Sequence, residues 1–430
     1  MEAMTASQMY IVIGIFLFMI VSFTLNKWPF GLTTMTCCAL LVLTGIYPIT
    51  KAFSGFAMKN LVLIAGMYVV VDAFGRTSLL TKIREKVTKL QSTSTFVLLL
   101  ILMVLTMLFA QFLPASGTIT VMIMILSALA PDSEVCPSRM LLPIGVMGMM
   151  WTGRIPIGMG AASHLTANKY IASYGETLPQ LAITDMLKVA IIPMLILTAY
   201  TMLTYKWLPK RDVDQSKLKA LKETKAMSKT HETITYAVFV GVMIALFMNN
   251  ILGDIMYVIP ACAAIILQFT KVESQKDMQR VLSGDLIFML AGIFVMADAL
   301  SESGAGILIG NLILKLMGSN PSGLKVLFVF ATAGVVMTNL MTNSGCKNVL
   351  LPLAISTAVA AGWDPRGLAL LVNFICSCAC FLPSGAPSTA IAFAAGGYKL
   401  SETVKWGLGF AVVAIVSACL SINFFFPVMG

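Results

Sequence analysis

Charged residues are scarce in this chain, and their scarcity excludes an ordinary soluble domain. Only 11% of the 430 residues are Asp, Glu, Lys or Arg, whereas a soluble globular domain carries about 25%. The mean hydropathy is +0.90, and apolar stretches of about 18 residues or more recur along the chain. Stretches of this length are typical of helices that cross a membrane. We therefore predict an all-α polytopic membrane protein.

Histidine is nearly absent, which argues against an enzyme. The chain has two histidines, no His-Glu-x-x-His motif and no Gly-rich phosphate loop that ends in Lys-Ser/Thr. The segments "TNSG" and "LPSGAPS" resemble serine sites, but a serine nucleophile needs a base, which only two histidines can supply. We expect neither catalysis nor a primary pump, and no cofactor apart from coupling ions.

The nine cysteines lie mostly in apolar segments, where a free thiol packs as a small hydrophobic group. Cys376, Cys378 and Cys380 alternate in a pattern that leaves a metal site open. No Cys-x-x-Cys pair accompanies them, so packing is the preferred interpretation.

The net charge of +10 indicates membrane topology rather than a nucleic-acid partner. Long basic loops of membrane proteins stay in the cytoplasm. If the central basic linker lies in the cytoplasm, most other basic residues fall on the same side. Both chain ends then lie on the outer side of the cytoplasmic (inner) membrane. The linker and its flanks hold Lys206, Lys210, Arg211, Lys217, Lys219, Lys222, Lys225 and Lys229.

The two halves of the chain resemble each other. "LIAGMYVVVDAF" matches "MLAGIFVMADAL", which places Asp72 and Asp298 at matching positions. Further matches follow in the same order at nearly the same offset: "SG" at 54 and 283, "ASGTITV" at 115 with "NSGCKNV" at 343, and "PIGMGAA" at 156 with "PSGAPST" at 383. Several matches at a nearly constant offset indicate an internal duplication.

Each half is predicted to contain five transmembrane helices, one of them broken, and a re-entrant hairpin. An odd number of spans per copy makes the second repeat inverted. The domains are 1–207 for the first repeat, 208–232 for the basic linker and 233–430 for the second repeat. The spans are 9–27, 30–50, 58–74, 139–173 (broken) and 185–207, then 233–251, 254–271, 284–300, 365–398 (broken) and 403–427. Hairpins are expected at 94–130 and 322–360, and interfacial arms at 76–91 and 302–317.

Two polar islands interrupt the hairpins: "PASGTIT" (114–120, the first island) and "TNSGCKN" (342–348, the second island). Non-helical backbone at membrane depth is tolerated where it lines a cavity. Helix N-termini at such a place suit an anion, and unwound carbonyls suit a small cation. Inverted repeats with broken helices and a midplane site are the architecture of secondary transporters.

At this point the sequence resembles the divalent anion:sodium symporter family of the ion transporter superfamily. "PSRMLLP" (137–143) is similar to the family's "PSKLLIP", and "GGYKLSETVKWG" (396–407) fits its Gly-Gly-Tyr-x-x-Ser/Thr-(Asp/Glu)-x-x-Lys-x-Gly pattern. "SGT" and "TNS" stand where the family has Ser-Asn-Thr in each hairpin. "GMGAA" (158–162) and "GAPST" (385–389) stand at the family's Gly-Thr-x-x-Asn breaks. The motifs follow one another over nearly the whole chain.

The resemblance implies a substrate site and two sodium sites. The anion would lie between the islands and the second break, held by Ser116, Gly117, Thr118, Asn343, Ser344, Gly345, Pro387, Ser388 and Thr389. One sodium would lie near Ser116, Gly117 and Gly158, and another near Thr342, Asn343 and Gly385. The resemblance also implies an elevator-type movement and a homodimer.

The chain departs from the family pattern in the pocket. The family's asparagine is replaced by Gly117 in the first island and by Ala162 and Thr389 at the breaks. Two cations, Arg154 and Lys347, stand nearby, and a buried cation in a membrane is a functional candidate. Both are candidates to bind substrate carboxylates. Alternatively Lys347 stands in for a sodium ion, or both lie at the edge of an aqueous cavity.

The predicted function is secondary active transport of a small divalent anion, with a dicarboxylate such as succinate or malate preferred. A sulfate-like oxyanion is the next candidate, coupled to sodium or exchanged. A cation/proton antiporter of the same superfamily is the other alternative, but it requires a carboxylate in the pocket and neither island contains one. The partners are a small anion and the lipid bilayer, with no nucleic acid.

Overall fold

Every regular element described by the computed structural model is a helix. The described residues are 5–25, 27–78, 82, 94–126, 134–211, 227–282, 285–318, 321–340, 342–382 and 385–428. The predicted all-α class is confirmed across these ranges. Most of the arm expected at 76–91 and the middle of the basic linker lie outside them.

The first half alternates long helices with short helical turns. Its described elements are α1 (Ala6–Leu25), α2 (Phe30–Leu43), α3 (Ile49–Ala52), η1 (Ser54–Ala57), α4 (Lys59–Gly75), α6 (Thr95–Phe112), α7 (Ala115–Leu126), α8 (Pro137–Trp151), η2 (Gly158–Ala162), α9 (Leu165–Tyr174), α10 (Asp185–Thr204) and η3 (Tyr205–Trp207).

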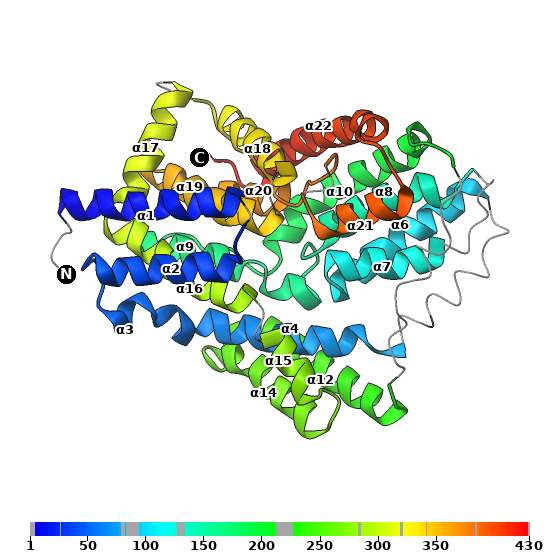
Figure 1. The fold of residues 1–430 in the computed structure, drawn as a ribbon, viewed down its shortest axis with the longest axis horizontal. Coiled ribbons are helices and arrows are strands. Elements are labelled where there is room, and N and C mark those ends of the chain that lie inside the picture. Colours follow the sequence, from blue (N-terminus) through cyan, green and yellow to red (C-terminus); the bar gives the residue numbers. More distant parts are fainter. Residues whose placement is uncertain are drawn as a thin grey trace.

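The second half also contains both long and short helices. Its described elements are α12 (Lys229–Phe247), α13 (Asn249–Leu252), α14 (Ile255–Phe269), α15 (Gln275–Leu282), α16 (Asp285–Glu302), α17 (Ala305–Met317), α18 (Gly323–Leu340), α19 (Asn343–Ala360), α20 (Pro365–Ile375), α21 (Pro387–Gly396) and α22 (Leu400–Phe425). Figure 1 shows most of these helices side by side, with α17 running across them. Residues that the nearest sequence match aligns between the two halves are called counterparts below.

Prolines and a polar cap mark several helix starts. Pro137, Pro365 and Pro387 lie in the first turns of α8, α20 and α21, where the missing backbone N–H costs no helical hydrogen bond. Before α20, the carboxylate of Asp364 accepts from the backbone N–H of Arg366 at 2.9 Å. Residues close to each start therefore favour the beginning of the helix at that position.

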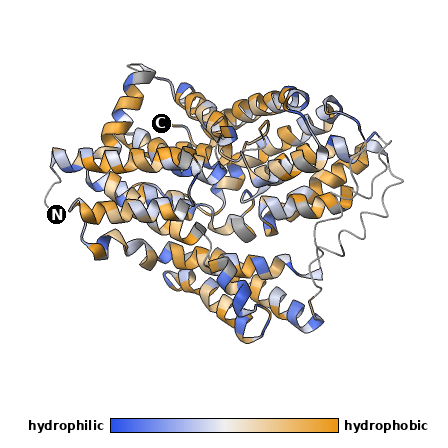
Figure 2. Cartoon of the chain, in the orientation of Figure 1, coloured by the Kyte–Doolittle hydropathy of each residue, from blue (hydrophilic) through white to orange (hydrophobic). Residues whose placement is uncertain are grey.

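Four helices in the described part of the chain are long and apolar enough to cross a membrane: α6, α10 with η3, α18 and α22. The other apolar helices, including α4 and α14, are shorter in the described residues. Hydrophobic residues dominate the helices throughout (Figure 2). α16 and α17 meet at 76°, and the interfacial arm expected at 302–317 stays a prediction. Because α6 and α18 are themselves long enough to cross, the re-entrant hairpins stay a prediction.

Two glycines bring helices from opposite halves into close contact. A methyl group on Gly66 in α4 would overlap the backbone of Pro260 and Ala261 in α14. A methyl group on Gly292 in α16 would overlap Thr34 in α2. Gly66 and Gly292 are counterparts, since both belong to the Ala-Gly pair of the first sequence match. Helices α4 and α14 thus form one close pair and α2 and α16 another, and α4 also contacts α16; we call these four helices together the scaffold.

The ends of α4 and α16 make polar contacts at matching positions. The charged residue is basic at the end of α4 and acidic at the end of α16. Arg76 at the end of α4 forms an ion pair with Glu273. Glu302 at the end of α16 accepts hydrogen bonds from Tyr47 Oη at 2.7 Å and from Lys51 Nζ at 2.5 Å. Arg76 and Glu302 are counterparts, and Tyr47 and Glu273 are separated by the same offset. Each contact joins the end of one scaffold helix to residues that follow another, α14 or α2.

Helices α6 to α10 and α18 to α22 form a second group, which we call the core. Within it α8 ends at Trp151 and α20 at Ile375, and α9 and α21 begin only at Leu165 and Pro387. We call residues 152–164 the first break and residues 376–386 the second break. Each predicted broken span thus contains two α-helices, and its course through a membrane stays a prediction.

Candidate functional site

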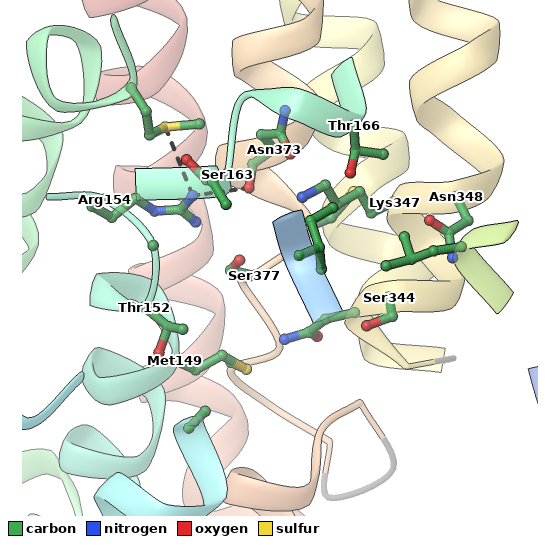
Figure 3. A pocket seen from close by; sticks show the side chains of 18 of the residues that line it. Met149, Thr152, Arg154, Ser163, Thr166, Ser344, Lys347, Asn348, Asn373 and Ser377 are labelled. Atoms are coloured by element: carbon green, nitrogen blue, oxygen red, sulfur yellow. Dashed lines mark hydrogen bonds between the residues drawn. The ribbon is translucent and has the colours of Figure 1, made fainter. Parts of the chain in front are cut away.

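A cavity of about 300 Å³ lies where the two breaks, the second island and the scaffold meet. It draws side chains from both halves of the chain. Polar lining residues are Tyr68, Thr152, Arg154, Ser163, Thr166, Asn343, Ser344, Lys347, Asn348, Asn373 and Ser377. Figure 3 shows most of them directed toward a common space.

The second island forms the first turns of α19 at one wall of this cavity. Thr342 caps the helix, because its hydroxyl accepts from the backbone N–H of Gly345 at 3.2 Å. Asn343 and Ser344 line the cavity, and Gly345 is buried behind them. The free N–H groups of a helix start favour negative charge. The island is therefore a helix N-terminus aimed at the site.

The Asn343 amide lies among three oxygen atoms. With its nitrogen turned toward them, the amide lies 2.7 Å from Thr338 Oγ1, 3.2 Å from the Cys376 carbonyl oxygen and 3.3 Å from the Gly385 carbonyl oxygen, and its two hydrogens are shared among these acceptors. The Thr338 hydroxyl in turn donates to the Cys376 carbonyl at 2.6 Å. Carbonyl, hydroxyl and amide oxygens are the ligands of hard cations in proteins. Of the two expected sodium sites, this one has several oxygen donors assembled.

Two amide side chains hold the breaks in place. Gln111 in α6 donates to the Trp151 carbonyl at 3.3 Å, at the end of α8. Asn339 in α18 donates to the Cys378 carbonyl at 3.0 Å and accepts from the Phe381 N–H at 3.1 Å. Gln111 and Asn339 are counterparts, and so are the residues whose carbonyls they bind, Trp151 and Cys378. Both amides satisfy backbone groups that a broken helix leaves free.

Arg154 is buried in the first break and is fully occupied by protein groups. Only 4% of the residue is exposed. Its Nε donates to the Met150 carbonyl at 2.7 Å, and its terminal nitrogens donate to the carbonyls of Asn373 and Phe374, both at 3.0 Å. The guanidinium carbon lies 4.9 Å from the centre of the Phe374 ring. Arg154 therefore joins the C-terminal ends of α8 and α20, which carry partial negative charge.

Lys347 behaves differently, although the sequence offered both cations as equivalent candidates. It lies on α19, lines the cavity, and has no hydrogen bond or ion pair with any described residue. Figure 3 shows its side chain extending into the space opposite Arg154. An ammonium group without a partner in such a site needs an anion or water.

The described residues that line the cavity include these two cations and no carboxylate. One side of the cavity is apolar, where Ala115 and Met149 contact Ala379 and Ala386. The site can therefore compensate negative charge on one side and contact carbon on the other.

Several residues expected at the site lie beside the cavity. Ser116 and Gly117 follow Ala115, which lines it, in the first turn of α7. Thr118 is buried and packs against Gly148 of α8. Gly158 begins η2, and Gly385 packs under Thr338 and Asn339. At the start of α21, Pro387 is exposed while Ser388 and Thr389 are buried.

Sequence reasoning missed the polar groups that come from outside the islands. Thr152, Ser163, Thr166, Asn373 and Ser377 line the cavity but stand in no motif. Thr338 and Asn339 lie just before the second island, and Gln111 just before the first. The offset between Gln111 and Asn339, which equals that between the two islands, was the one available signal for this pair.

The cysteines of the described residues are mostly buried. No group of three or more His, Cys, Asp or Glu side chains there forms a metal site. Cys376 Sγ lies 3.3 Å from Cys346 Sγ, and Cys380 donates to the Gly407 carbonyl at 3.2 Å. All nine cysteines are free thiols.

The sequences to which this chain is similar are those of transporters and not of enzymes, and with its apolar helices of membrane-spanning length the chain is a multi-pass membrane protein. The model of the citrate transporter family matches residues 15–373. The chain therefore belongs to the citrate transporter family. The predicted resemblance to the divalent anion:sodium symporters is confirmed, because its relatives include members of solute carrier family 13.

Two relatives and one solved structure show the extent of the similarity. Human solute carrier family 13 member 4 is 27% identical over 34% of this chain and 23% of its own length. The sodium-dependent high-affinity dicarboxylate transporter 3 of Caenorhabditis elegans is 30% identical over 34% of this chain and 26% of its own. This chain thus spans about a quarter of the length of these relatives. The YdaH transporter of Alcanivorax borkumensis shares the fold, with a TM-score of 0.60, 11% identity and coverage of 89% of each chain.

Proposed function

We propose that this protein is a secondary active transporter of a small divalent carboxylate, with succinate, malate or citrate as candidates. The observation that carries the proposal is the unpaired Lys347 ammonium in a cavity that has no lining carboxylate among the described residues. The N-terminus of α19 adds donors for the same charge. The Caenorhabditis elegans relative is named a dicarboxylate transporter, which supports this substrate class.

The size of the cavity supports a small substrate. At about 300 Å³ it lies at the lower end of the range for small-molecule sites. The apolar side formed by Ala115 and Met149 suits the carbon backbone of a carboxylate. A sulfate-like ion remains the alternative substrate, since Lys347 and the helix start bind any small oxyanion. The absence of a lining carboxylate in the described residues disfavours a proton antiporter.

Sodium coupling is proposed at the second break. The donors are the Thr338 hydroxyl, the Asn343 amide oxygen after a reversal of the amide, and the carbonyls of Cys376 and Gly385. Thr342 caps the adjoining helix start. A sodium ion bound here would hold the second island and the second break in one arrangement and so prepare the anion site. The other expected site, near Ser116, Gly117 and Gly158, stays a prediction.

The proposed mechanism is an elevator movement of the core against the scaffold. Support comes from the packing: the scaffold is closed by glycine contacts between opposite halves, and the cavity lies between scaffold and core. The contacts that recur between counterparts support inverted repeats at 1–207 and 233–430 around the cytoplasmic linker 208–232. We also propose re-entrant hairpins and a homodimer built by the scaffold. Both termini would lie on the non-cytoplasmic side of the inner membrane.

Uptake into proteoliposomes tests the substrate class and the coupling together. Radiolabelled succinate, malate, citrate and sulfate are offered with and without an inward sodium gradient. We expect saturable uptake of a carboxylate that the gradient accelerates. Sulfate uptake alone would establish the alternative substrate, and a failure to transport any of these anions would contradict the proposal.

A further inference from the structure

The two islands differ in the oxygen atoms that they offer to a cation. Around the second break, side-chain oxygens come from Thr338, Thr342 and Asn343. Their counterparts in the first half are Ala110, Pro114 and Ala115. The first island keeps the hydroxyl of Ser116, the counterpart of Ser344, and that of Thr118, which is buried against Gly148. At the positions that match Thr338, Thr342 and Asn343, the first half therefore offers a sodium ion no side-chain oxygen.

The first break has a fixed cation instead. Arg154 donates to the Met150 carbonyl of α8 and to the Asn373 and Phe374 carbonyls of α20. Its counterpart in the second half is Phe381, which carries no charge. The break with few oxygen ligands thus contains an arginine, and the break with many oxygen ligands does not.

A positive charge is needed at this place for an electrostatic reason. α8 and α20 both end beside the cavity, and each helix C-terminus carries about half a negative charge. Two such ends repel an anion in a poorly solvated site. Transporters with broken helices commonly place a transported cation against such ends. Arg154 already occupies these carbonyls with three nitrogen donors.

We propose that Arg154 is a resident cation that takes the place of one coupling sodium ion at the first break. It positions the two broken helices and leaves Lys347 to bind the anion. The role that the sequence suggested for Lys347, standing in for sodium, then belongs to Arg154. The inference rests on the proposed function, and it predicts that a single sodium ion, bound at the second break, accompanies each anion.

The test is the shape of the sodium activation curve for initial uptake in proteoliposomes. Wild-type protein should give a hyperbolic curve. Arg154→Gln removes the charge and opens a place for a second ion, so its curve should become sigmoidal, with half-activation at a sodium concentration about ten-fold higher. Arg154→Lys, which keeps the charge, should stay hyperbolic.

Lys347→Gln is the matched control, because it removes the other cation of the same cavity. It should lower the apparent anion affinity at every sodium concentration and leave the curve hyperbolic. The inference is overturned if Arg154→Gln behaves like Lys347→Gln, with weak anion binding that sodium does not restore. A sigmoidal wild-type curve, or a wild-type flux of two sodium ions per anion measured with radioactive sodium, would overturn it even if Arg154→Gln failed to fold.

Other results separate the inference from the proposed function. If wild-type uptake is independent of sodium, the sodium site at the second break is wrong. Arg154→Gln should then become sodium-dependent, and an unchanged variant contradicts the inference. If no anion is transported, thermal stabilisation by sodium alone is compared in detergent. Sodium should stabilise Arg154→Gln more than wild type, and equal stabilisation would contradict the role of Arg154.

Discussion

At the scale of single residues, the chemistry of this protein depends on which polar groups already have partners. Arg154 and Lys347 line the same cavity, yet Arg154 gives its donors to three backbone carbonyls and Lys347 gives none to the described residues. Among the amides, Asn339 is fully used in holding the second break. Asn343 also has partners, but these are three oxygens that a cation could share after a reversal of the amide. A satisfied polar group shapes the site, and an unsatisfied one binds the ligand.

Replacing Thr338 with valine tests the sodium site at this scale. Thr338→Val keeps the shape and removes a hydroxyl that contacts Asn343 and Cys376. A contact with a charged group contributes about 1.5–3 kcal/mol, so half-activation by sodium should need at least about ten-fold more sodium. Sodium-dependent uptake measures this, and the anion KM at saturating sodium should not change because Thr338 does not line the cavity.

Thr106→Val is the matched control for this substitution. The Thr106 hydroxyl is buried in α6 and bonds to the Leu102 carbonyl of its own helix. Its removal should leave sodium activation as in wild type. Equal loss of sodium affinity in both variants would place the effect in general packing and remove Thr338 from the sodium site.

At the scale of elements, close contacts between helices of opposite halves define the scaffold. Gly66 and Gly292 each allow one helix to touch the backbone or a β-branched residue of another. Such contacts strengthen helix association in membranes, where small residues let backbones approach. The breaks have the opposite character, since their free carbonyls are held by side chains such as Gln111 and Asn339.

Adding one methyl group to the scaffold should therefore be costly. In Gly292→Ala the new carbon overlaps Thr34, and overpacking of this kind costs about 1–3 kcal/mol. We expect a lower thermal unfolding temperature in detergent. Gly241→Ala in α12 is the control, because nothing lies within 4 Å of its new carbon, and alanine is favoured over glycine in a helix by about 0.5–1 kcal/mol. A Gly292→Ala protein as stable as Gly241→Ala would show that α2 and α16 can move apart freely.

At the scale of the whole molecule, the contacts between scaffold and core differ between the two halves of the chain. Lys169 of α9 forms an ion pair of 2.7 Å with Asp298 of α16, and Ser301 donates to the Ser173 carbonyl. Asp298, which the sequence match pairs with Asp72, thus makes a contact between scaffold and core. The counterpart of Lys169 is Gly396, so the opposite repeat has no equivalent lysine. The ion pair therefore belongs to one of the two end states of the proposed movement.

Breaking this ion pair should shift the balance between the end states. The side chains of Lys169 and Asp298 are 23% and 21% exposed, and a loss of about 1.4 kcal/mol would change the population ratio about ten-fold. Asp298→Asn should change the rate at which Ser344→Cys is labelled from each side of the membrane. Asp254→Asn, which breaks the Lys59 pair at an 86% exposed aspartate, should leave labelling unchanged. Unaltered labelling in Asp298→Asn would mean that the pair does not bias the states.

The sequence by itself determined the class of this protein, its family and the places where its helices are interrupted. These properties depend on local composition, on helix-start residues such as Pro137 and Pro365, and on matches at a nearly constant offset, all of which are readable along the chain. The sequence also limited the candidate cations of the binding site to Arg154 and Lys347. Helices α8 and α20 end where the sequence expected broken spans.

Only the tertiary structure decided what each candidate does. Arg154 is satisfied by carbonyls at positions 373 and 374, which lie in the other half of the chain and carry no mark of this contact in their residue types. Thr118 packs against Gly148. Thr152, Ser163 and Asn373 line the cavity, although they belong to no motif. Backbone groups have no sequence signature, so their pairing with a distant side chain becomes visible only once the chain is folded.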